Sequence, residues 1–350
     1  MFFTSDNASG AAPEILAAVA AADPSYTGAY GGDQVTERAV ARVREVFEAP
    51  EAAVYFVATG TAANALALAT LCPPWGAVYC HRISHVEVDE CGAPEFFTGG
   101  AKLTLLDGDH AKLQTASLEE AARMAAPVGV HNVQRGAVSI TQATELGAVY
   151  TLAEIEELCA IARAYDMPVH MDGTRLANAL ARSNHSAAEM TWRAGVDILC
   201  LGATKNGALA AEAVVIFDPA RAWEFELRRK RGGHLFSKMR FVSAQIEAFL
   251  TDGLWLGLAG HANAMADRLA AGMAGIKGAE VTNSVEANML FATITCGQHR
   301  RLQEAGARYY PMNPTQDEAG AEDAPLDIRL VTSFRTEPGD VDRFLEVLAG

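Results

Sequence analysis

Short, nearly uncharged apolar runs recur along this chain and alternate with alanine-rich segments. Runs of four to eight such residues are typical of strands buried on both faces, as in a parallel sheet. They occupy residues 54–57, 77–80, 137–140, 168–171, 197–200 and 213–216. Helical apolar spacing marks residues 13–22, 34–47, 61–71 and 118–126. The alternation predicts βαβ units, and hence an α/β fold with a mostly parallel sheet and helices on both faces.

The pattern changes after about residue 241. A helical stretch at 255–273 precedes a predicted strand at 288–295, an acidic Pro- and Gly-containing segment at 311–325, a strand at 328–331 and a last helix. We interpret 311–325 as a solvated loop. We therefore expect an N-terminal arm (1–20), a large α/β domain (21–250) and a small C-terminal α+β domain (251–350).

Charge and cysteine usage narrow the class of partner. The formal net charge is -15. A chain so negatively charged lacks the excess of basic residues that would attract a phosphate backbone, so we expect no nucleic-acid partner. No stretch of about 18 apolar residues suggests a membrane span, and the N-terminus has no signal-peptide pattern. Six cysteines are scattered without a Cys-x-x-Cys pair, which suits reduced thiols. We expect a cytoplasmic protein that acts on a small molecule.

Three segments carry residue types suited to one chemistry. Asp172 follows the run 168–171, at the strand end where an open α/β sheet presents its ligand site. Lys205 follows the run 197–200 among small residues, an environment in which a lysine can lose its proton and react with an aldehyde. Thr59-Gly60-Thr61 joins a strand to a helix, whose first N–H groups can hold a phosphate.

Together these segments match the three requirements of a pyridoxal 5'-phosphate (PLP) site. Such a site anchors a phosphate, holds a protonated ring nitrogen and binds an aldehyde. The chain contains neither a GxGxxG nor a GxxxxGK[ST] motif, which weakens the alternative of a nucleotide-binding module.

The chain resembles the low-specificity L-threonine aldolases, a family of fold-type I PLP enzymes. The matching stretches are residues 30–33, 59–62, 84–93, 170–175, 202–207 and 329–331. The resemblance covers nearly the whole chain. It implies a PLP-dependent transferase-like fold with a seven-stranded-type sheet, and a homodimer or homotetramer with sites at the dimer interface. It also implies reversible cleavage of L-β-hydroxy-α-amino acids, such as L-threonine, L-allo-threonine or L-phenylserine, to glycine and an aldehyde.

The resemblance also implies roles for single residues. Lys205 would carry the cofactor, Asp172 would pair with its ring nitrogen and His85 would stack on its ring; these are the expected catalytic residues. The other implied cofactor contacts come from Thr59, Gly60, Thr61, Arg175 and Thr204. Ser5, Arg175 and Arg329 would surround the substrate carboxylate, and Glu90 would tune the protonation of His85.

Two departures from the family bear on the site. Many members have Asp where this chain has Gly32. Many also carry a histidine after the strand that contains Ser139 and Ile140, where this chain reads Thr141-Gln142-Ala143-Thr144-Glu145. That histidine cannot be the base here, so the contacts on the aldehyde side are not carried over.

Several other interpretations of these residues stay open. His81 and His85, four residues apart, would suggest a metal pair on a helix, but no third ligand has suitable spacing, so we expect no metal. Arg329 would form an ordinary ion pair with Asp327. A different PLP reaction such as β-elimination, or a silent PLP-binding protein, remains the alternative function.

Overall fold

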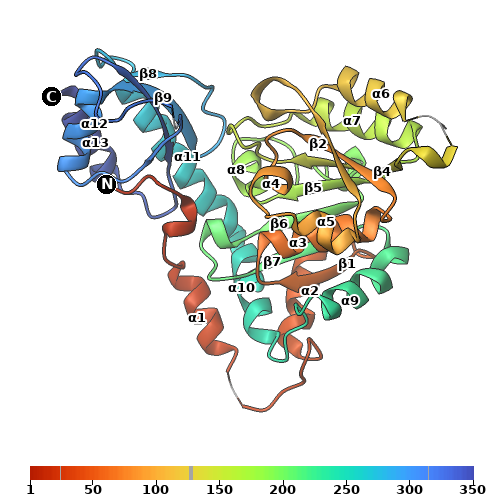
Figure 1. The fold of residues 1–350 in the computed structure, drawn as a ribbon. Coiled ribbons are helices and arrows are strands. Elements are labelled where there is room, and N and C mark those ends of the chain that lie inside the picture. The colour runs from red at the N-terminus through yellow and green to blue at the C-terminus, as the bar shows by residue number, and fades with distance from the viewer. Residues whose placement is uncertain (24, 126–128, 314) are drawn as a thin grey trace.

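A seven-stranded sheet forms the centre of the molecule (Figure 1). The computed structural model describes residues 1–23, 25–125, 129–313 and 315–350. Six of the strands run in the same direction, and β7 runs antiparallel to both of its neighbours. The spatial order is β1 (Ala53–Val57), β7 (Glu212–Ile216), β6 (Ile198–Gly202), β5 (Val169–Gly173), β4 (Gln134–Thr141), β2 (Gly76–His81) and β3 (Lys102–Leu106).

The prediction of a mostly parallel sheet is confirmed, and each of the six apolar runs coincides with a strand, although the runs 168–171 and 197–200 begin one residue before theirs. The strand that these runs did not include is β3, which forms an edge and begins at the exposed Lys102. An edge strand needs no continuous apolar run, because solvent reaches part of it. The antiparallel direction of β7 places its first residue, Glu212, beside the last residues of β1 and β6, Val57 and Gly202.

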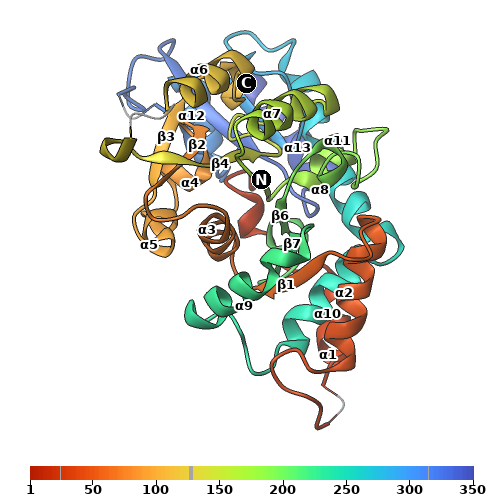
Figure 2. The same ribbon diagram turned by 90° about the vertical axis from the view of Figure 1, so that its right-hand side faces the viewer.

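Helices cover both faces of this sheet, as Figures 1 and 2 show. The hydrophobic cluster on one face contains residues of α3 and α9, and the cluster on the other contains residues of α2, α6, α7, α8 and α10. Neighbouring strand residues alternate between the two clusters, as in Val214 and Val215. The helices are α1 (Pro13–Ala21), α2 (Gln34–Val46), α3 (Gly60–Leu71), α4 (His85–Val88), α5 (Ala93–Thr98), α6 (Thr115–Met124), α7 (Leu152–Ala164), α8 (Leu176–Leu180), α9 (Ala222–Arg231) and α10 (Arg240–Leu250).

The four predicted helices correspond to α1, α2, α3 and α6. Their predicted bounds agree within one residue for the first three, whereas α6 begins three residues before the predicted start at Leu118. The end of that prediction, residue 126, lies outside the described residues. Among the helices that the structure describes, none is both long and apolar enough to cross a membrane.

A second, antiparallel sheet follows and has a hydrophobic core of its own. Its order is β10 (Tyr310–Pro311), β11 (Pro325–Val331), β9 (Met289–Thr295) and β8 (Glu280–Val281), and it packs with α11 (Leu254–Met273), α12 (Cys296–Glu304) and α13 (Pro338–Ala349). The predicted helix 255–273 and strands 288–295 and 328–331 are thus found. The segment 311–325 contains no helix and only the ends of two strands among its described residues, which exclude residue 314.

The first residues of the chain belong to this second core. Phe3 is fully buried there, and the edge of its ring meets Phe344 at 5.3 Å between centroids. Its N–H donates to Arg308 and its carbonyl accepts from the N–H of Val331. The division at residues 20 and 250 stays a prediction, but the first residues clearly pack against the C-terminal sheet.

We predict that Phe3→Ala destabilises the protein by about 3–5 kcal/mol, because it opens a cavity in a fully buried aromatic cluster. Phe2→Ala is the matched control, since that side chain is 56% exposed, and it should change the free energy of unfolding by about 0.5 kcal/mol or less. Urea unfolding followed by circular dichroism measures both variants. Equal losses would contradict the assignment of Phe3 as the residue that holds the N-terminus.

Candidate active site

One cavity gathers most of the predicted site residues. It measures about 320 Å³ and lies where β1, β5 and β6 end. Six predicted residues line it, namely Thr59, Gly60, Thr61, His85, Thr204 and Lys205. The other residues of its wall are Asn7, Ala58, Asn64, Asp89, Thr174 and Glu212. Asp172 adjoins it through hydrogen bonds to Asn64 and Thr174.

The N-terminus of α3 forms one wall of this cavity. Thr59 caps the helix, and its hydroxyl accepts a hydrogen bond from the N–H of Ala62 at 3.2 Å. The N–H of Ala63 donates to the carbonyl of Thr59. The N–H groups of Gly60 and Thr61 precede this first turn of hydrogen bonds, so the helix leaves them available to an anion.

Asp172 is an ionised carboxylate in the interior. Burial alone would raise its pKa, but a hydrogen bond from the Thr174 hydroxyl and the charge of His85 outweigh burial and hold the pKa below its ordinary value. Oδ1 accepts from the Thr174 N–H at 3.0 Å and from its hydroxyl at 2.6 Å. Oδ2 accepts from the amide of Asn64 at 3.0 Å. Such a fixed negative charge can stabilise a protonated ring nitrogen.

Asn64 connects this carboxylate to a second one. Its amide nitrogen also donates to Oε1 of Glu90 at 2.9 Å, and that oxygen lies 2.8 Å from Nδ1 of His85. The hydrogen bond to Glu90 raises the pKa of His85 above its ordinary value, although burial opposes it. Burial likewise raises the pKa of Glu90. The imidazole is therefore oriented through Nδ1, and its Nε2 lies 3.6 Å from Oδ2 of Asp89.

Lys205 lies on the turn that follows β6. Burial lowers its pKa, the charge of Arg175 lowers it further, and Asp6 and Asp172 act in the opposite direction. The turn is fixed by a hydrogen bond from Asn206 to the carbonyl of Trp255 at 2.8 Å. A lysine with a lowered pKa has more of the neutral amine that attacks a carbonyl.

The two predicted carboxylate-binding arginines are in different states. Arg175 is bound by Asp6 at two points, Nε to Oδ2 at 2.8 Å and Nη2 to Oδ1 at 2.9 Å. Arg329 donates through Nη2 to the carbonyl of Thr4 at 3.2 Å, while its buried Nε has no partner among the described residues. Arg329 therefore has a buried N–H without a partner, whereas two N–H groups of Arg175 are already bound to Asp6.

The structure also bears on Ser5, on the possible ion pair between Arg329 and Asp327, and on the possible histidine pair. The Ser5 hydroxyl accepts from the N–H of Asn7, so it caps a local turn beside Asp6. Asp327 accepts from Thr293 and Gln316, and in the described part of the chain no ion pair joins it to Arg329. The alternative that His81 and His85 lie on one helix is wrong, because His81 is the last residue of β2 and His85 is the first residue of α4.

Sequence reasoning missed several residues that surround the site. Asn64 lies three residues after the predicted phosphate turn Thr59-Gly60-Thr61, and Asp6 follows Ser5, but their long-range partners left no local signal. Glu145 is half-buried, and its pKa is raised by burial although the charge of Arg175 opposes this. It is the last residue of the stretch that departs from the family. Glu212 is buried beside the lysine turn, where it lines the cavity.

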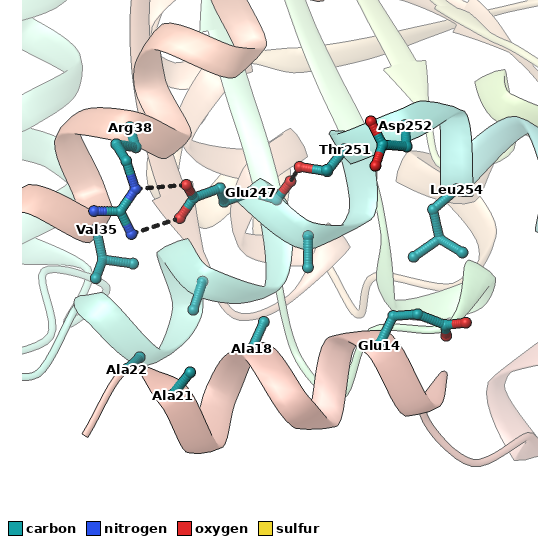
Figure 3. Close-up of a pocket in the computed structure, with 12 residues that line it drawn as sticks. Glu14, Ala18, Ala21, Ala22, Val35, Arg38, Glu247, Thr251, Asp252 and Leu254 are labelled. Carbon is teal, nitrogen blue, oxygen red and sulfur yellow. Dashed lines mark hydrogen bonds and ion pairs between the residues drawn. The ribbon is translucent and has the colours of Figure 1, made fainter. Parts of the chain in front are cut away.

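A second cavity, of about 440 Å³, lies between α1, α2 and α10 (Figure 3). Much of its wall is alanine, including Ala18, Ala21 and Ala22. Its most prominent polar groups, Arg38 and Glu247, are already paired at 2.7 Å, as the figure shows. This cavity therefore lacks the reactive groups that the first one contains.

Comparison with known proteins agrees with this geometry. The profile of the beta-eliminating lyase family matches residues 3–295. The low specificity L-threonine aldolase of Pseudomonas sp. (strain NCIMB 10558) is 43% identical over 308 residues, which cover 88% of each chain. The structure of Leishmania major threonine aldolase superposes with a TM-score of 0.91 at 29% identity, covering 99% of this chain and 98% of that one. Serine palmitoyltransferase of Sphingomonas wittichii shares the fold, with a TM-score of 0.73 at 16% identity over 100% of this chain and 86% of that one.

The sheet, the lysine turn and the buried carboxylate place this protein among the α/β enzymes of fold type I. Within that class, the chain belongs to the family of beta-eliminating lyases that contains the low-specificity L-threonine aldolases.

We predict that Glu90→Gln lowers the pKa of His85 below its ordinary value, because the charged partner is lost while the burial that disfavours a charged imidazole remains. A proton NMR titration of the cofactor-free protein measures the midpoint. Asp89→Asn is the control, since Asp89 is exposed and 3.6 Å from Nε2, and it should shift the midpoint less. An unchanged midpoint in Glu90→Gln would contradict the proposed pairing.

Proposed function

We propose that this chain is a PLP-dependent aldolase that cleaves L-β-hydroxy-α-amino acids to glycine and an aldehyde. The observation that carries the proposal is the single cavity in which a lysine of lowered pKa and a free helix N-terminus lie beside a buried, ionised carboxylate. Relatives that are named low-specificity L-threonine aldolases support the choice of reaction. The preferred aldehyde is left to experiment.

The residues present fit the cofactor. The unpartnered N–H groups of Gly60 and Thr61 suit its phosphate, with the hydroxyls of Thr59 and Thr204 in the same cavity. We assign Lys205 as the amine that carries the aldehyde and Asp172 as the partner of the ring nitrogen, with His85 against the ring and Arg175 near the ring hydroxyl. When bound, PLP supplies an electron sink for the carbanion that C–C cleavage leaves behind.

The protein's own groups then position the substrate and move its proton. Arg329 holds the carboxylate through the Nε that lacks a partner, and Arg175, already fixed by Asp6, supplies positive charge beside it, with Ser5 close by. His85 accepts the proton of the β-hydroxyl through Nε2, because Glu90 occupies Nδ1. The charged imidazole that results is stabilised by Glu90.

We also propose a homodimer or homotetramer with sites at the dimer interface, and a cytoplasmic location. Large apolar side chains on the surface support association: Phe96 is 78% exposed, Trp223 68% and Trp75 65%. Six cysteines without disulfide partners support a reducing compartment. The substrate is a small amino acid, and the negative net charge still argues against nucleic acid.

We predict that the purified protein with added PLP releases glycine and an aldehyde in equal amounts from L-threonine, L-allo-threonine and L-phenylserine. Reverse-phase detection of glycine and a coupled reduction of the aldehyde measure both products. L-Serine separates the main alternative, because β-elimination would give pyruvate and ammonia. PLP binding without any product would favour a silent binder.

We predict that Lys205→Ala abolishes the absorbance of protein-bound PLP and lowers kcat by about a thousandfold or more, because the covalent attachment and its amine are both lost. Lys102→Ala is the control, since that lysine is exposed at the edge strand, and it should leave both unchanged. Full activity in Lys205→Ala would refute the assignment.

A further inference from the structure

A buried acid, Glu212, shares the cavity with the proposed phosphate cradle. It is the first residue of β7 and is paired in the sheet with Val57 and Gly202. Val57 precedes the turn that begins α3, and Gly202 precedes the turn that carries Lys205. Glu212 therefore stands between the two turns that together would bind the cofactor.

The carboxyl group is held in place by the lysine turn. Its Oε2 accepts a hydrogen bond from the N–H of Ala203 at 2.9 Å. The side chain of the next residue, Thr204, is bound just before β7, since its hydroxyl accepts from the N–H of Ala211 at 3.2 Å. Glu212 cannot swing away from the cavity without releasing this turn.

Apart from the N-terminus of α3, the groups around Glu212 offer little positive charge to a second anion. The groups that face it are the cation Lys205 and the anion Asp172, with the buried thiol of Cys200 on the neighbouring strand. Among the described residues that line the cavity, Lys205 is the one lysine or arginine. Attachment of an aldehyde to Lys205 adds no positive charge to the cavity, and Asp172 also interacts with the charge of Lys205. A phosphate dianion in this cavity would then share one cation with two carboxylates, Asp172 and Glu212.

We propose that Glu212 holds a proton whenever the phosphate of the cofactor occupies this cavity, so that at a pH where this carboxyl is ionised in the free protein, binding of PLP takes up one proton from solvent onto it. This inference rests on the proposed function, because it requires PLP as the ligand. It adds a phosphate-sensing acid to the site and makes cofactor retention dependent on pH.

Even before the cofactor binds, the Glu212 carboxyl is partly protonated near neutral pH. Burial raises the pKa of Glu212 to about 7, although hydrogen bonds from Thr204 and Ala203 and the charge of Lys205 favour the ionised form. Below that pH the carboxyl is neutral and binding needs no further proton. Above it the carboxyl is ionised, so the phosphate must bind together with a proton and the apparent affinity falls as the pH rises.

The test compares wild type with Glu212→Gln, a neutral side chain of the same shape that can still accept the Ala203 hydrogen bond. Apoprotein is titrated with PLP between pH 6 and 8.5 and the protein-bound absorbance gives Kd. We expect equal affinities at pH 6 and, at pH 8.5, a wild-type Kd about thirtyfold weaker than that of Glu212→Gln. Calorimetry at pH 8 in two buffers of different ionisation enthalpy should show about one proton more taken up by wild type.

One control tests whether the effect requires the phosphate, and a second tests whether it is specific to Glu212. Pyridoxal, which has the aldehyde and ring but no phosphate, should bind wild type and Glu212→Gln with a ratio of affinities that does not change with pH. Glu280→Gln, at an exposed position of β8, should behave as wild type with PLP. If Glu212→Gln does not fold, wild type alone decides, because its proton uptake with PLP should exceed that with pyridoxal at pH 8.

The outcomes separate this inference from the proposed function. Equal proton uptake by wild type and Glu212→Gln, with PLP bound to both, would overturn the role of Glu212 and leave the aldolase proposal standing. Failure of PLP to bind wild type at any pH would overturn both. A steeper fall in affinity with pH for pyridoxal than for PLP would also overturn it, since the phosphate would then not be the group that senses the carboxyl.

Discussion

A fully buried carboxylate that keeps its charge is the constraint on which the site depends. Asp172 lies in the interior, where a lone carboxylate would take up a proton. Hydrogen bonds from Thr174 and the charge of His85 prevent this, and Asn64 donates a further hydrogen bond. Thr174 directly follows β5 and Asn64 lies on α3, so the carboxylate joins the sheet edge to the helix that packs on it. The environment of this carboxylate therefore depends on the packing of α3.

The arm at the N-terminus extends this dependence to the second sheet. Phe3 is anchored in the core that includes Phe344, and three residues later Asp6 binds Arg175 at the end of β5. Asn288, just before β9, donates to the same carboxylate at 3.1 Å. The positions of Arg175 and Arg329 are therefore linked through a short segment that touches both sheets. A change in the packing of the small sheet would alter the charge that faces the substrate.

Local pattern in the sequence predicted many of the strands and helices well, because a run of apolar residues itself indicates that the segment is buried. It also marked Asp172 and Lys205 as candidates, since a strand end followed by a reactive side chain is a local signal, and the structure brings both residues to one cavity. It could not predict that Asn64 joins Glu90 to Asp172, because these residues are separated by 26 and 108 positions. Nor could it show that Asp6 forms an ion pair with Arg175, because these two residues are 169 positions apart. Such pairings follow from the folded geometry alone.

The direction of β7 explains why an acid can sit so near a phosphate cradle. In a wholly parallel sheet the strand between β1 and β6 would present its last residue at this edge. Because β7 runs the other way, its first residue lies there, and the chain reaches it directly from the lysine turn. That geometry keeps the turn short and fixed by Oε2 of Glu212, but it also buries a carboxyl beside the cavity. Rigidity of the lysine turn and proton dependence of the site therefore have the same structural origin.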